Sequence, residues 1–429
     1  MGRTVKVGIL GLGVVGAELA NIIKSNQDNV FKKYGVKLEI GKVYVRDVNK
    51  RRATDTSGLM LTTNAYDVVY DSDIDVICEC MGGSGTEETR DYVVKAIESS
   101  KSVVMSSKKV LALYGNEILE LLKERDVSLR YDATVGGGIP ITKIIKECFK
   151  GERIDGIVGI LNATSNFIYT RMEKDSMSFE DALKKAQKLG YAENDPSEDI
   201  NGFDALYKAV VLTLFSMKKW VDIKTLSTTP FSNINVLDMK YAAELGYKIK
   251  PLVIVENRTN GIRYRLGPCL IKENHIAANT VENYNIIVFR GSNSGVLGFY
   301  GQGAGSKPTA SAMFDDLVGI ISSRDGAADG LLKETYRDIT SVENASENKN
   351  NLYWRIGVEN IVGKLALICT ILAKNSVNIE KVIQKDQIND KIGVVLLTSN
   401  ADSTTISKIV DEFSENGIEI ETILPFLGE

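Results

Sequence analysis

The chain has 429 residues, of which 44% are hydrophobic and 25% are charged, and its formal net charge is −4. A chain of this length and composition builds two or three soluble domains, each with its own core. The small net charge and the lack of a long basic run argue against nucleic acid or an anionic membrane as the main partner. No apolar stretch reaches the roughly 18–20 residues of a membrane-spanning helix, and we expect a cytoplasmic protein.

The cysteines and the single histidine narrow the possible chemistry. Five scattered cysteines without metal-ligand spacing predict buried thiols in a reducing compartment, at Cys78, Cys80, Cys148, Cys269 and Cys369. The only histidine, His275, lies in a polar stretch, which disfavours a Ser-His-Asp triad or a zinc site with several imidazoles. Proton transfer must therefore fall to lysine or carboxylate side chains.

A glycine motif follows the first β-branched run, residues 4–10, and precedes a helical pattern. Strand, glycine turn and helix in this order are the context of a dinucleotide-binding fingerprint. Gly11 permits the tight turn, Gly13 lets a pyrophosphate approach the backbone, and Gly16 lets the helix pack on the strand. A purely structural turn is the alternative. The predicted phosphate-binding residues are Gly11, Gly13, Val14, Val15 and Gly16.

The second predicted strand, within residues 36–52, ends in charged residues that select the cofactor. Asp47 suits a ribose diol and therefore NAD, whereas Arg46 suits the 2′-phosphate of NADP. Three further cations follow Arg46, at Lys50, Arg51 and Arg52, so we predict NADP and keep NAD as the alternative. A solvated basic turn would explain the same residues.

Apolar runs alternate with helical spacers through residue 133, which predicts a parallel, doubly wound sheet. Lys108 directly follows one of these strands, so we expect it at the carboxyl edge, where such sheets bind ligands. Residues 132–140, DATVGGGIP, then interrupt the pattern. The triple glycine favours a domain hinge, with a hard-cation site as the alternative.

The most acidic stretch is residues 190–208, GYAENDPSEDINGFDALYK, which ends in a lysine. Residues 202–217 read as a helix, on which Asp204 and Lys208 lie one turn apart. Such a pair is ordinarily a solvated surface contact. The apolar turns that follow indicate a buried helix instead, and a partly buried lysine held by a carboxylate suits a proton donor. Both interpretations stay open on local grounds.

Residues 151–305 contain fewer helical spacers late in the region, which predicts a mixed or antiparallel sheet of a substrate and dimerisation domain. Residues 301–305 precede a helix through about Ser322, so Gly303 is a further candidate for phosphate binding, with a plain loop as the alternative. The polar stretch 341–351 reads as a linker. Residues 352–429 then follow a βαββαβ pattern without an acid–base constellation of their own.

Taken together, the motifs GLGVVG, DATVGGGIP, GILNATSNFIYTRM, GYAENDPSEDINGFDALYK and GQGAGSKPTASA make residues 1–330 resemble homoserine dehydrogenases over their whole length. Residues 352–429 look like an appended ACT domain. The expected organisation is a dinucleotide-binding domain (1–132 with about 306–335), a catalytic and dimerisation domain (133–305), a linker (336–351) and the ACT-like domain. The expected fold class is α/β, with a Rossmann-type sheet, a mixed α+β domain and a βαββαβ domain.

The resemblance implies reversible, NAD(P)H-dependent reduction of L-aspartate 4-semialdehyde to L-homoserine. It makes Lys208 the proton donor, Asp204 its orienting neighbour, and Lys108 a residue near nicotinamide and substrate. It implies substrate binding by Glu193, Asp199 and Thr164, with Glu193 on the ammonium group. It also implies a monovalent-cation site, such as one for sodium, at Asp132, Val135, Gly137 and Ile139.

Three positions depart from the family's pattern. Ser107 replaces an asparagine before the lysine, Asp132 replaces a glutamate in the cation motif, and Val362 replaces the proline that opens the ACT helix. The resemblance further implies a homodimer or homotetramer and an amino-acid effector such as threonine at the ACT-like domain. A catalytically silent nucleotide- or amino-acid-sensing protein is the alternative from another class.

Overall fold

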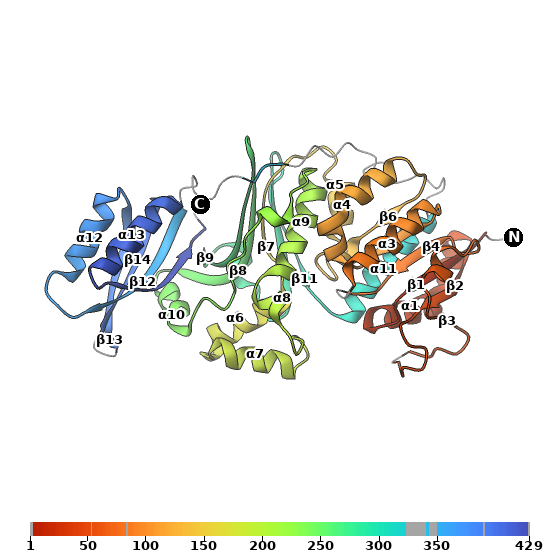
Figure 1. The fold of residues 1–429 in the computed structure, drawn as a ribbon, viewed down its shortest axis with the longest axis horizontal. Coiled ribbons are helices and arrows are strands. Elements are labelled where there is room, and N and C mark those ends of the chain that lie inside the picture. Colours follow the sequence, from red (N-terminus) through yellow and green to blue (C-terminus); the bar gives the residue numbers. More distant parts are fainter. Residues whose placement is uncertain are drawn as a thin grey trace. The chain divides into compact units, whose positions relative to one another are not determined.

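A computed structural model describes residues 3–52, 54–82, 85–322, 340–342, 350–388 and 391–427. The chain divides into two compact units, each built from segments that are far apart in the sequence (Figure 1). Unit 1 consists of Met1–Ile154, Tyr207–Lys224 and Gly291–Thr340. Unit 2 consists of Asp155–Leu206, Thr225–Arg290 and Ser341–Glu429. Most of the predicted linker, residues 336–351, lies outside the described residues.

Unit 1 contains a six-stranded sheet in the order β3-β2-β1-β4-β5-β6. All of its neighbouring strands pair in parallel, and the order reverses direction at β1, which confirms the predicted doubly wound sheet. The central strands β4 and β5 are almost wholly buried, as parallel strands covered on both faces must be, whereas the edge strand β3 is half-exposed or exposed. The strands of this sheet are β1 (Arg3–Leu10), β2 (Val36–Tyr44), β3 (Met60–Thr62), β4 (Val76–Glu79), β5 (Ser102–Met105) and β6 (Leu129–Arg130).

The helices of unit 1 include one from much later in the chain. Helix α11 (Ser306–Ser322) packs beside α1 (Val14–Tyr34), and Met313 and Leu317 are fully buried in the core that surrounds β1. Helix α4 (Lys108–Lys123) begins directly after the short loop that follows β5. The other helices of this unit are α2 (Tyr66–Val69), α3 (Thr86–Glu98) and α5 (Ile141–Cys148).

The second sheet has the order β11-β10-β7-β8-β9. Strand β8 pairs antiparallel with both of its neighbours, as the scarcity of helical spacers predicted. The strands are β7 (Ile154–Ile160), β8 (Tyr247–Arg258), β9 (Gly261–Lys272), β10 (Tyr284–Gly291) and β11 (Gly295–Gln302). The helices of this region are α6 (Ala163–Asp175), α7 (Phe179–Lys188), α8 (Ser197–Ile200), α9 (Phe203–Met217) and α10 (Val236–Glu244).

The C-terminal part of unit 2 is a βαββαβ module with the antiparallel strand order β13-β14-β12-β15. Every element that the sequence pattern indicated here is present. Trp354 and Phe413 are fully buried and meet edge to face in its core. The elements are β12 (Asn350–Glu359), α12 (Lys364–Lys374), β13 (Asn378–Ile388), β14 (Lys391–Ala401), α13 (Ser403–Glu415) and β15 (Glu419–Pro425).

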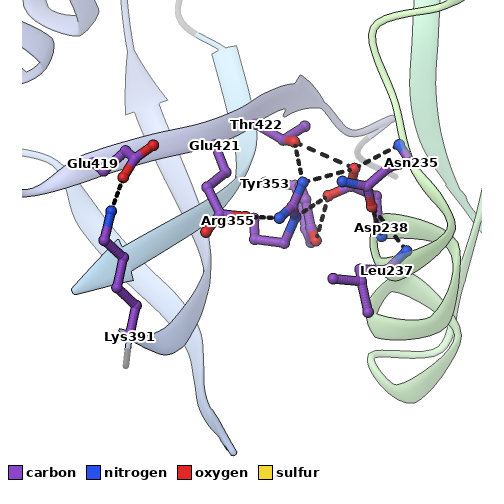
Figure 2. Close-up of polar contacts among 9 residues, drawn as sticks. All are labelled: Asn235, Leu237, Asp238, Tyr353, Arg355, Lys391, Glu419, Glu421 and Thr422. Atoms are coloured by element: carbon purple, nitrogen blue, oxygen red, sulfur yellow. Dashed lines mark hydrogen bonds and ion pairs between the residues drawn. The ribbon is translucent and has the colours of Figure 1, made fainter. Parts of the chain in front are cut away.

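A buried ion pair joins this module to α10 (Figure 2). Asp238 is fully buried, and its Oδ1 accepts a hydrogen bond from Arg355 Nε at 2.7 Å. The hydroxyls of Tyr353 and Thr422 donate to the two carboxylate oxygens of Asp238 at 3.1 and 3.2 Å. Arg355 also pairs with Glu421. Asp238 therefore anchors the module, because its carboxylate accepts hydrogen bonds from three side chains of the module.

One expectation needs correction. Cys78, Cys80 and Cys269 are buried as predicted, but Cys148 is exposed because it ends α5 on the surface, and Cys369 is only half-buried. His275 is a structural residue, since its Nδ1 accepts a hydrogen bond from the Ala277 N–H at the start of a short 3-10 helix. Within the described ranges, no helix is both long and apolar enough to cross a membrane.

Candidate active site

A cavity of about 650 Å³ opens in unit 1 where β1 runs into α1. Gly11 has φ +95°, and a Cβ at this position would lie 2.8 Å from the carbonyl oxygen of Cys80. A Cβ at Gly16 would lie 2.1 Å from the Gly11 carbonyl oxygen, so both positions require glycine. A Cβ at Gly13 would meet open space, which leaves the backbone at the N-terminus of α1 accessible to a phosphate group.

The predicted phosphate-binding residues divide into two sets. Gly11, Gly13 and Val14 line the cavity, together with Ser306 at the start of α11. Val15 instead packs against the core, and Gly16 is buried beneath the turn. Gly303 is buried and lies beside Gly137, where a Cβ would meet its carbonyl group. None of these three residues lines the cavity.

The opposite wall of the cavity carries the predicted cofactor selector. All five charged residues of this segment line it: Arg46, Asp47, Lys50, Arg51 and Arg52. The guanidinium of Arg52 donates to the carbonyl oxygens of Asp47 and Lys50 at 2.5 and 2.7 Å, so it folds the loop. Arg46, Lys50 and Arg51 are exposed and can meet an anionic group directly.

Lys108 occupies the first position of α4, immediately after the loop that follows β5. The buried Glu79 fixes that loop, because its carboxylate accepts hydrogen bonds from the backbone N–H groups of Ser106 and Ser107 at 3.2 and 2.9 Å. Burial raises the pKa of Glu79, and these N–H groups oppose the shift. Glu79 was not among the predicted site residues, although an acid inside the apolar run VICEC signals a fixed partner.

In unit 2, one amide joins two of the predicted acidic residues. The Nδ2 of Asn162 donates to Asp199 Oδ1 at 2.7 Å and to Asp204 Oδ2 at 2.8 Å. Asn162 is 2% exposed and Asp204 is 7% exposed. Lys208, one turn later on α9, is 8% exposed, so the pair is buried and the surface interpretation is wrong. Asn162 was also missed, although it stands in the quoted motif GILNATSN.

The other predicted substrate-binding residues occupy different environments. Thr164 is buried at the start of α6, and its hydroxyl donates to the carbonyl oxygen of Tyr191 at 2.8 Å. That bond draws residues 190–195 toward α6. Glu193 is exposed, and its carbonyl oxygen accepts a hydrogen bond from Gln187 Nε2 at 3.1 Å. The Glu193 carboxylate is therefore accessible to a solute.

The predicted cation motif contains a buried carboxylate that is only partly satisfied. Asp132 Oδ1 accepts hydrogen bonds from the backbone and hydroxyl of Thr142 at 2.9 and 2.7 Å. Oδ2 accepts none, which fits a hard cation, but the Lys143 ammonium lies 3.9 Å from this oxygen and competes for it. The Ile139 carbonyl accepts from Ile141 N–H at 2.7 Å. Cation binding by Asp132, Val135, Gly137 and Ile139 stays a prediction.

A parallel, doubly wound sheet whose glycine turn lines a cavity, together with the buried Asp204 and Lys208 one turn apart on α9, indicates a Rossmann-type NAD(P)-dependent oxidoreductase. Family models agree with this class in both parts of the chain. Residues 11–132 match the NAD-binding domain of homoserine dehydrogenase, and residues 140–318 match the homoserine dehydrogenase domain. The chain belongs to the homoserine dehydrogenase family.

Individual relatives extend this similarity over nearly the whole chain. A homoserine dehydrogenase of Bacillus subtilis is 34% identical over 409 residues, which cover 94% of each chain. The crystal structure of a homoserine dehydrogenase from Thiobacillus denitrificans superposes with a TM-score of 0.91 at 33% identity and covers 99% of this chain and 98% of its own. The crystal structure of the S. aureus homoserine dehydrogenase at pH 6.5 superposes with a TM-score of 0.80 at 25% identity and covers 100% of both chains.

Proposed function

We propose that this chain reversibly reduces L-aspartate 4-semialdehyde to L-homoserine, with NADP(H) as the preferred cofactor and Lys208 as the proton donor. The observation that carries the proposal is the buried pair of Asp204 and Lys208 on α9, with Asp204 held by Asn162. A bound reduced nicotinamide supplies the hydride for this reaction. The chain's own residues bind the substrate, orient it and deliver the proton.

The role of Lys208 follows from the charge that develops on the substrate. An aldehyde carbon that receives a hydride leaves an alkoxide oxygen, which is too basic to persist in a closed site. An ammonium group stabilises this charge and then transfers a proton from Nζ to the oxygen. Loss of one such electrostatic donor costs about 2.7–4 kcal/mol of barrier, and a general acid contributes about 10²–10⁴-fold. Asp204, one turn earlier on the same face of α9, orients the lysine.

The remaining residues have supporting roles in this proposal. Lys108 follows a loop that Glu79 holds rigidly, which suits a second cation near the reacting carbonyl group. The exposed Glu193 carboxylate binds the ammonium group of the substrate. Thr164 and Asp199 belong to the same hydrogen-bonded region around the start of α6 and contact the polar end of the substrate.

NADP preference rests on the cationic wall of the cavity. Arg46, Lys50 and Arg51 offer three exposed cations to a 2′-phosphate, against the single carboxylate of Asp47. Moreover, Asp47 Oδ1 accepts a hydrogen bond from the Asn49 backbone at 2.8 Å, which occupies one of the oxygens that a ribose diol would need.

One assay tests the reaction and the cofactor together. Purified protein is given aspartate 4-semialdehyde with NADPH or with NADH, and the loss of absorbance at the nicotinamide band is followed. We expect turnover with both cofactors and a higher kcat/KM with NADPH. Absence of turnover with either cofactor would contradict the proposed reaction, whereas a preference for NADH would contradict only the assignment of Arg46.

The C-terminal βαββαβ module is proposed to be an ACT-type domain that binds an amino-acid effector. Its topology supports this assignment, and α12 begins after Gly363, whose φ of +94° presents the N-terminus of that helix beside a fully exposed Val362. Activity measured with and without threonine, at saturating substrate and cofactor, tests regulation. Unchanged kinetics across amino acids would leave the module a structural or dimerisation domain.

A further inference from the structure

Asn162 joins three segments of unit 2 at one buried point. It is the residue before α6, and its Oδ1 accepts a hydrogen bond from the Ser165 backbone N–H at 2.7 Å. Its Nδ2 donates to Asp199, within α8, and to Asp204, in the first turn of α9. The Ser165 hydroxyl adds a bond to the Asp199 carbonyl at 3.2 Å, so α8 is tied to α6 twice.

The helix cap fixes the orientation of the amide. An asparagine amide has one acceptor oxygen and two donor hydrogens. Because the oxygen caps α6, the NH₂ group must point toward the two carboxylates, and each N–H serves one of them. Serine or aspartate can replace the cap, since both are good N-cap residues. Neither can donate two hydrogen bonds from this position, so asparagine is required to hold both carboxylates but not to cap α6.

We propose that Asn162 is a positioning residue of the reaction. It holds the carboxylates of Asp199 and Asp204 in one arrangement, so that Asp204 orients Lys208 while Asp199 faces the substrate. Two carboxylate oxygens bound to the same nitrogen, at 2.7 and 2.8 Å, lie close enough to repel each other. The shared amide offsets this repulsion by donating one hydrogen bond to each group. This inference rests on the proposed reaction.

Two substitutions separate positioning from capping. Asn162→Asp keeps the shape and the cap but replaces the double donor with a third carboxylate. Neighbouring negative charges raise carboxyl pKa values, so ionised Asp204 is reached only at higher pH. We expect kcat/KM to fall about 10- to 100-fold at pH 7, the scale of a misplaced catalytic group. The acidic limb of the pH profile should move upward by at least about one unit, with activity partly recovered on the alkaline side.

Asn162→Ser keeps the cap and adds no charge. We expect a similar fall in kcat/KM with a smaller upward move of the acidic limb than in Asn162→Asp, because the carboxylates lose their donor without gaining a third negative charge. Ser178→Ala is the matched control, since Ser178 caps the adjacent helix α7 through the Asp181 N–H and has no part in the site. Its loss should lower the melting temperature and leave the pH profile and kcat/KM unchanged.

Binding of NADPH, followed by fluorescence titration, completes the test. Asn162 does not line the nucleotide cavity, so the Kd for NADPH should stay within about twofold in every variant. The inference is overturned if both Asn162 variants keep wild-type kcat/KM and pH profile, or if Ser178→Ala reproduces their losses. An inactive wild-type enzyme would overturn the proposed reaction instead, and the two failures are thereby distinct. If the aspartate variant does not fold, the kcat/KM of Asn162→Ser alone tests the inference.

Discussion

Unit 2 contains two buried aspartates in contrasting environments, Asp238 and Asp204. Asp238 is surrounded by a guanidinium and two hydroxyls from the C-terminal module, and it also closes the capping box of α10 with Asn235 (Figure 2). Asp204 is held by a neutral amide that it shares with a second carboxylate. A guanidinium balances the charge of its partner, whereas an amide fixes the position of a carboxylate without changing its charge.

This difference explains how one residue type serves two purposes. A carboxylate that is paired and hydrogen-bonded inside the fold contributes to a unique arrangement of parts. A carboxylate that is positioned by a neutral group keeps its charge for a substrate or a neighbouring catalytic residue. We therefore expect substitutions at Asp238 and its partners to change stability, and substitutions around Asp204 to change catalysis.

The largest effect is expected for Arg355→Ala, which leaves Asp238 buried without its cation. Removal of one partner of a buried pair costs about 3–5 kcal/mol of unfolding free energy. Chemical denaturation of the purified protein measures this loss. Lys391→Ala is the matched control on the same sheet, because its partner is the exposed Glu419 and the pair is screened by water. Equal losses for the two variants would contradict the structural role of Asp238.

Lys208→Ala tests the catalytic role that we assign to the surroundings of Asp204. We expect turnover to fall at least about a hundredfold, since the alkoxide loses its donor, while NADPH still binds. Asp204→Asn should also lower turnover without a matching loss of stability. Steady-state kinetics and a thermal melt on the same preparations give both readouts. Near-normal turnover of Lys208→Ala would remove this lysine from the proton-donor role.

Asp316 is a third buried acid and extends the comparison to unit 1. Burial, with a further contribution from Asp132, raises its pKa to about 6 from an ordinary 3.8. Folding therefore favours the protonated form, so the stability that this group contributes is present below about pH 4 and is lost as the pH rises through 6. Asp316→Asn should raise the melting temperature more at pH 8 than at pH 4.

The ammonium of Lys143, 3.3 Å from Asp316 Oδ1, is partly exposed and can be hydrated in that variant. Glu120→Gln removes an exposed carboxylate and serves as the control, with the same small shift expected at both pH values. A gain for Asp316→Asn that is no larger at pH 8 than at pH 4 would show that this carboxyl is satisfied when ionised.

The smallest effect is expected for Glu193→Gln. Glu193 is exposed, so its substitution should leave folding and turnover nearly unchanged. Loss of its charge should raise KM for aspartate semialdehyde, by up to about tenfold, because the ammonium group loses a charge-assisted hydrogen bond. Gln187→Ala, which removes the side chain that donates to the Glu193 carbonyl, tests whether the position of this segment matters as well. An unchanged KM in both variants would show that the ammonium group of the substrate binds at another residue.

Local patterns predicted those features that depend on neighbours in the sequence. The glycine turn, the alternation of strands and helices and the whole βαββαβ module were correctly predicted, because turn geometry and hydrophobic periodicity are short-range properties. Glu79 was not predicted as part of the site, since the two loop residues that it holds lie 27 and 28 positions away along the chain. Cys148 was wrongly assigned to the interior for a similar reason, as exposure at a helix end depends on the packing of that helix.

The sequence by itself determined the family, the nucleotide-binding turn and the helix that carries Asp204 and Lys208, because each rests on motifs that are runs of adjacent residues. Only the tertiary structure decided that this pair is buried, that Asn162 joins Asp199 to Asp204, and that Arg355 anchors the C-terminal module on Asp238. These contacts join residues 37 to 117 positions apart. Their partners are set by the packing of helices and sheets, and no local pattern encodes that packing.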